Sequence, residues 1–160
     1  MIKPVQFENL FKALSDVQLR WHSQEASLLK KEITNKDNFK ILIIEDNEFN
    51  MLLTRTLIQN ILPNVQILEA KDGFIGLKLV KENQIDLILM DIQMPEMNGY
   101  EVTREIRCLE SDVQIPIIAL TAGSVKGEKE KCLAAGMNDF VVKPVIEQTL
   151  REIIRKWLKQ

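Results

Sequence analysis

Side chains that can take part in phosphoryl transfer stand at the ends of four apolar segments of this chain. The segments "FKILIIED" and "IDLILMD" end in carboxylates, "IPIIALTA" carries a threonine near its end, and "DFVVKP" carries a lysine. The residues in question are Glu45, Asp46, Asp91, Thr121 and Lys143. Crowded carboxylates repel one another unless a cation neutralises them, and oxygen ligands favour a hard cation, above all Mg²⁺. The set therefore predicts a magnesium site.

The same residue types have defined uses in phosphoryl transfer, where catalysis is mainly positioning and charge neutralisation. A lysine contributes positive charge, a hydroxyl donates a hydrogen bond, and an aspartate can be the nucleophile that forms an acyl phosphate. A single aspartate at a strand end is more often a helix cap or a turn residue. Only the complete set favours the chemical interpretation over the structural one.

The segments that carry these residues alternate strand and helix patterns. Short apolar runs predict buried parallel strands, and apolar residues at helical spacing predict the helices between them. The expected strands are 39–46, 65–70, 85–91, 115–122 and 139–144, and the expected helices are 48–61, 74–83, 100–109, 128–136 and 146–159. This alternation predicts an α/β fold, a doubly wound five-stranded parallel sheet with helices on both faces. Function in such sheets lies outside the carboxyl ends of the strands.

Four stretches resemble the receiver domain of two-component response regulators. They are "IIEDNEFNMLL", "LILMDIQMPEMNGYE", "IIALTA" and "GMNDFVVKP". The run from Asp46 to Asn50, with "GMNDF", is most similar to the C-terminal receivers of hybrid sensor histidine kinases, although Asn47 and Asn50 could equally cap and orient the first helix. The resemblance implies a flavodoxin-like strand order 2-1-3-4-5. It also implies a receiver domain over residues 39–160, preceded by a helical extension over 1–38.

The resemblance assigns roles in a His-to-Asp phosphorelay. It implies that Asp91 accepts a phosphoryl group from a phosphohistidine on a histidine kinase or a histidine phosphotransfer protein. It implies Mg²⁺ as the cofactor, held by Glu45, Asp46, Asp91 and the backbone carbonyl of Gln93. It implies that the phosphoryl oxygens are bound by Thr121, Lys143 and the backbone N–H of Ala122. Activity of the domain itself would be limited to self-phosphorylation and slow dephosphorylation, while a parent chain could be a histidine kinase.

The resemblance also implies a switch. Phosphorylation adds roughly 1.5 to 2 negative charges, which draw Thr121 and Lys143 toward the new group. Phe140 would then turn inward, although a plain core aromatic is the alternative interpretation. The fourth and fifth helices of the domain, with the strand between them, form the face that regulates partner proteins. The bond between Lys143 and Pro144 is expected to be cis.

The first 38 residues predict one amphipathic helix. Its apolar stripe consists of Phe7, Leu10, Leu14, Val17, Trp21 and Leu28. The stripe fits a helix packed on its own receiver domain as well as a coiled-coil connector, through which the chain could dimerise. The tripeptide "KPV" at Lys3 and again at Lys143 suggests that this helix ends a preceding receiver domain. His22 is expected to be a surface residue rather than a phosphotransfer site.

Composition excludes several other classes of function. The formal net charge of −2 gives no basic field for nucleic acid. Cys108 and Cys132 have no metal-site or disulfide-framework spacing, and no apolar run approaches the length of a membrane span. The expected compartment is the cytoplasm, either for this chain alone or as part of a membrane-anchored parent, without membrane contact by this segment.

Three competing functions use the same fold. A degenerate receiver would act only as an interaction domain, but such domains usually lack the acceptor aspartate or the lysine. A magnesium-dependent phosphatase with an aspartate nucleophile usually carries a second acid where Gln93 stands. A nucleotide- or flavin-binding module needs a phosphate-binding loop after the first strand, where "EDNEFN" offers acids instead.

Overall fold

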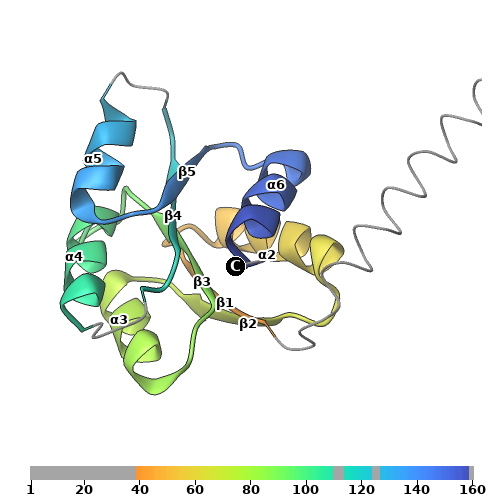
Figure 1. Ribbon diagram of the computed structural model, residues 1–160, viewed down its shortest axis with the longest axis horizontal. Helices are drawn as coiled ribbons and strands as arrows, with labels where there is room; N and C mark the ends of the chain where they lie inside the picture. The colour runs from red at the N-terminus through yellow and green to blue at the C-terminus, as the bar shows by residue number, and fades with distance from the viewer. Residues whose placement is uncertain (1–38, 110–113, 124–126, 159–160) are drawn as a thin grey trace, which may run out of the picture. The chain divides into compact units, whose positions relative to one another are not determined.

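The computed structural model describes residues 39–109, 114–123 and 127–158, in which five strands alternate with five helices (Figure 1). The strands are β1 (Lys40–Ile44), β2 (Gln66–Ala70), β3 (Leu87–Asp91), β4 (Ile117–Thr121) and β5 (Asp139–Val142). The helices are α2 (Glu48–Ile61), α3 (Gly73–Glu82), α4 (Gly99–Leu109), α5 (Glu128–Ala135) and α6 (Glu147–Leu158). The helix expected within residues 1–38, with its interpretation as the end of a preceding receiver, lies outside the described residues, as does His22.

All neighbouring strands pair in parallel, in the order β2-β1-β3-β4-β5. In Figure 1, α2 and α6 cover one face of the sheet, and α3, α4 and α5 cover the other. The doubly wound fold and its strand order are therefore confirmed. The strand order reverses between β1 and β3, so the crevice at their carboxyl ends is where this topology places a site. No helix in the described ranges has the length and apolarity needed to cross a bilayer.

Burial explains why the central strands form. Every residue of β3 and β4 is buried, as a strand covered by helices on both faces requires. Local signals set the helix ends. The Asn47 side chain caps α2 by accepting hydrogen bonds from the backbone N–H groups of Phe49 and Asn50. Gly136 ends α5 with a φ of 100°, a left-handed conformation that favours glycine.

Arg107 links α4 to the segments that lead into β4 and β5. From α4 its guanidinium donates to the carbonyls of Gly136 and Ile115, each at 2.9 Å, and to Oδ1 of Asn138 at 2.8 Å. The same Asn138 oxygen accepts the backbone N–H of Ile117 at the start of β4. These bonds fix α4 against the start of β4 and against the turn that leads into β5. Thr121 ends β4, and Lys143 follows β5.

Candidate functional site

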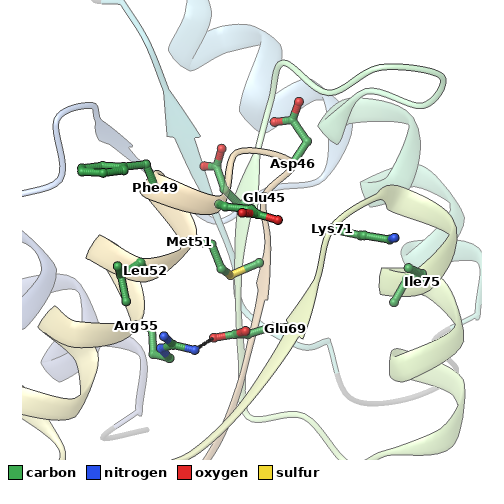
Figure 2. A pocket seen from close by; sticks show the side chains of 10 residues that line it. Glu45, Asp46, Phe49, Met51, Leu52, Arg55, Glu69, Lys71 and Ile75 are labelled. Carbon is green, nitrogen blue, oxygen red and sulfur yellow. Dashed lines mark hydrogen bonds and ion pairs between the residues drawn. The ribbon is translucent and has the colours of Figure 1, made fainter.

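Three carboxylates meet where β1 and β3 end. Glu45 and Asp46 follow β1, Asp91 is the last residue of β3, and oxygen atoms of the three lie within 4.8 Å of one another. Glu45 and Asp91 are buried, with exposures of 1% and 4%, while Asp46 is exposed. Figure 2 shows Glu45 and Asp46 side by side at the top of β1. The structure thus brings together the acids that the sequence places at separate strand ends.

Lys143 supplies the positive charge nearest to these acids. Its Nζ lies 2.7 Å from Oε2 of Glu45 and 3.1 Å from Oδ1 of Asp91, and its side chain is 18% exposed. Burial alone would lower the pKa of Lys143, but its hydrogen bonds to Glu45 and Asp91 outweigh burial and raise that pKa above the usual value. The ammonium therefore stays charged. The expected cis bond between Lys143 and Pro144 is present.

Glu45 is held by hydrogen bonds at both of its oxygens. Oε1 accepts from the backbone N–H of Asn47 at 3.3 Å and from Nδ2 of Asn50 at 3.2 Å, while Oε2 accepts from Lys143. Asn47 caps α2, as the sequence allowed, but the Asn50 side chain binds Glu45. Asn50 is thus a residue of the site that sequence reasoning did not identify. Its signals in the sequence were its place at the end of the Asp46-to-Asn50 run and its position in the first turn of a helix.

Asp91 is a carboxyl group with a raised pKa. Burial, and then repulsion by Glu45, raise its pKa to about 6, although Lys143 and the backbone N–H of Gln93 oppose the shift. That N–H lies 3.2 Å from Oδ1 of Asp91. Gly99 packs against the same strand end, because a Cβ atom there would lie 2.4 Å from the Asp91 carbonyl oxygen. The backbone of Asp91 is therefore confined as well as its side chain.

The donor set fits Mg²⁺. Carboxylate oxygens are the ligands that hard cations prefer, and two carboxylates with room for water suit Mg²⁺ in particular. One ammonium near three acids leaves negative charge that a divalent cation would balance. Glu45 already uses both oxygens in hydrogen bonds. Asp46 and Asp91 are consequently the acids best placed to bind the ion directly, and Glu45 could bind it directly or through water.

Thr121 is the last residue of β4 and is buried. Its Oγ1 lies 3.4 Å from the Gly123 carbonyl and 3.4 Å from Oε2 of Glu128, a residue that sequence reasoning did not include. Ala122, which follows Thr121, is exposed. Phe140, on β5, is half-buried and packs against the core cluster on the α4 and α5 side of the sheet.

Residues 41–155 match the family model described as the response regulator receiver domain. The chain belongs to this family. The sensor histidine kinase GacS of Pseudomonas protegens is 33% identical over 158 residues, which cover 97% of this chain and 17% of that kinase. The kinase BarA of Escherichia coli K12 is 32% identical over 157 residues, which cover 98% of this chain and 17% of that kinase. The chain therefore spans about a sixth of the length of the relatives that it matches.

Two solved receiver structures are similar to this one. The receiver domain of the sensor histidine kinase PA1611 from Pseudomonas aeruginosa, with magnesium coordinated in its active-site cleft, has a TM-score of 0.69 at 35% identity, covering 77% of this chain and 99% of that one. The Saccharomyces cerevisiae receiver domain of Ssk1, crystallised with the histidine phosphotransfer protein Ypd1, has a TM-score of 0.69 at 30% identity, covering 76% of this chain and 89% of that one. This chain is a receiver domain similar to segments of sensor histidine kinases and to solved receiver structures.

The raised pKa of Asp91 predicts that stabilisation by Mg²⁺ depends on pH. In the metal-free protein, this carboxyl's contribution to stability is lost as pH rises through about 6, because the folded state favours its protonated form. Mg²⁺ binds the ionised form and offsets that loss. We expect Mg²⁺ to raise the melting temperature clearly at about pH 8 and only slightly at about pH 5.

Calorimetry with and without Mg²⁺ checks this expectation. Asp46→Asn should abolish most of the stabilisation, while Glu48→Gln, at an exposed acid outside the three-carboxylate cluster, should preserve it. An equal rise in melting temperature at both pH values would contradict the placement of Mg²⁺ on Asp91.

Proposed function

We propose that Asp91 accepts a phosphoryl group from a phosphohistidine. The observation that carries the proposal is a buried carboxylate with Lys143 Nζ 3.1 Å from its Oδ1, within an acid cluster that fits Mg²⁺. An Asp91 oxygen forms a bond to phosphorus while the phosphorus–nitrogen bond breaks. The leaving ring nitrogen keeps the electron pair of that bond and takes up a proton from water.

Each neighbouring residue has a role in this proposal. Asp46, Asp91, the Gln93 carbonyl and Glu45 would hold Mg²⁺, which would supply positive charge beside the incoming anion. Lys143 exchanges its contact with Asp91 for one with a phosphoryl oxygen. Thr121 and the backbone N–H of Ala122 donate to the other phosphoryl oxygens. The exposed side chain of Gln93 offers no carboxylate for phosphatase chemistry.

Phosphorylation would be transmitted through β4 and β5. The backbone N–H of Lys143 donates to the Thr121 carbonyl at 2.7 Å. A displacement of Thr121 is therefore passed to Lys143 through this hydrogen bond. Thr121 moves toward the phosphoryl group and Phe140 turns inward behind it. The face built by α5, β5 and α6 then changes its contacts with partner proteins. The added charge at Asp91 would thus alter a surface away from the phosphorylated residue.

Phosphorylation by a small donor tests the acceptor role. Wild-type protein incubated with Mg²⁺ and acetyl phosphate should gain the mass of one phosphoryl group, because the site needs no partner to bind phosphate and metal. Asp91→Asn should gain none, since an amide is not a nucleophile for this reaction. Intact-mass spectrometry measures the gain. An undiminished label on Asp91→Asn would overturn the assignment.

The start of α2 supports a docking surface for the histidine-bearing partner. Phe49 is 81% exposed and Leu52 48%, and α2 begins three residues after Glu45. Figure 2 shows Phe49 at the start of α2 with its ring directed away from Glu45, and Leu52 further along the same helix. A donor histidine must approach Asp91 along this edge of the sheet. An apolar helical surface on the partner would bury these side chains, as large exposed apolar residues at interaction sites commonly are.

Removing the Phe49 ring should separate docking from chemistry. Phe49→Ala should slow transfer from a phosphorylated histidine phosphotransfer protein about tenfold, because apolar contact with the partner is lost. Phosphorylation by acetyl phosphate should not change. Leu109→Ala, which removes a 47% exposed side chain at the last residue of α4, away from the carboxyl ends of the strands, is the control. Equal transfer rates for the two variants would place the partner elsewhere.

A further inference from the structure

Glu128 connects two side chains that belong to different elements. Its Oε2 accepts a hydrogen bond from the Tyr100 hydroxyl at 3.0 Å and lies 3.4 Å from Oγ1 of Thr121. Tyr100 is in the first turn of α4, Thr121 ends β4, and Glu128 begins α5. The Glu128 side chain is only 21% exposed, although it stands at the start of a short surface helix. One carboxylate oxygen thus joins three elements beside the phosphoryl-binding edge of the sheet.

Tyr100 holds this carboxylate in place. Burial, and then the hydrogen bond to Glu128, raise the pKa of Tyr100, so its hydroxyl remains a donor. Lys131 Nζ lies 3.6 Å from the other carboxylate oxygen, Oε1. The Tyr100 hydrogen bond thus places Oε2 beside Thr121, while the exposed Lys131 makes only a looser contact with Oε1.

The contact matters because a threonine hydroxyl carries a single hydrogen. When Thr121 donates to Glu128 or to the Gly123 carbonyl, that hydrogen is not available to a phosphoryl oxygen. The contact therefore favours the unphosphorylated arrangement.

We propose that Glu128 is a positioning residue that retains the Thr121 hydroxyl in the unphosphorylated state, so that the phosphoryl group must compete with it for this donor. The proposal rests on the proposed role of Thr121 as a phosphoryl ligand. Glu128 touches neither the phosphoryl group nor the metal. Glu128 sets how strongly the unphosphorylated arrangement is favoured. Tyr100 contributes indirectly, because its hydroxyl holds the Glu128 carboxylate.

Binding of beryllium fluoride, a mimic of the phosphoryl group, tests the proposal in the presence of Mg²⁺. Glu128→Ala should bind the mimic about fivefold more tightly than wild type, the change expected for loss of one weak competing hydrogen bond to a charged group. Tyr100→Phe should tighten binding less, because the carboxylate remains but loses its anchor. Isothermal calorimetry gives the affinities, and the melting temperatures without the mimic report any loss of stability.

Two comparisons separate retention of Thr121 from other effects of the substitution. Glu130→Ala removes an exposed acid from the same first turn of α5, so it should reproduce any effect on the helix dipole without changing affinity for the mimic. In a Thr121→Ala background, Glu128→Ala should no longer tighten binding, because it acts only through the hydroxyl.

The outcomes distinguish this inference from the function on which it rests. A wild-type protein that binds no beryllium fluoride would overturn the proposed function itself. Wild-type binding with unchanged affinity in Glu128→Ala, and a lowered melting temperature, would leave the function intact and make Glu128 a structural residue only. Tighter binding that persists in the Thr121→Ala background would also overturn the inference, since the effect would then be one of charge alone.

Discussion

Two buried carboxylates share the ammonium of one lysine, and the rest of the site depends on how far this one positive charge neutralises them. Glu45 and Asp91 are almost fully buried, and Lys143 Nζ lies 2.7 Å and 3.1 Å from their oxygens. Removing one member would leave an uncompensated charge in a poorly solvated place, which is costly. The arrangement needs strand ends that are distant in sequence. Only a sheet that sets β1 beside β3, with β5 two strands further along, brings the three side chains together.

The same balance makes the site responsive. With exposed Asp46 added, three acids face one ammonium, and this negative excess suits a divalent cation. A phosphoryl group changes the local charge again and offers Lys143 a new partner. Because the Lys143 backbone N–H is bonded to the Thr121 carbonyl, a response at one ligand reaches the other. The contacts of Thr121 with Gly123 and Glu128 then set how strongly the resting arrangement is preferred.

Sequence patterns predict the architecture well because its signals are local. The helix predicted over residues 48–61 has those bounds in α2, since Asn47 caps it and Pro63 follows it. Strands were predicted too long at their ends. The fourth, predicted from residue 115, begins at Ile117, because Pro116 has no N–H to donate to the ladder. The acids at strand ends were visible for the same local reason. The contacts of Asn50 with Glu45 and of Glu128 with Thr121 could not be predicted, because they depend on how side chains from different elements lie in the folded protein.

The pKa of Asp91 in the metal-free protein is the measurement that tests this account most directly. Carbon NMR of the labelled carboxyl follows its titration in wild type and in Lys143→Met. The account predicts a wild-type pKa near 6, raised by burial and by Glu45, and a higher value once the ammonium is gone. An ordinary aspartate pKa in both proteins would contradict it, because the carboxylates would then be neither buried together nor balanced by Lys143.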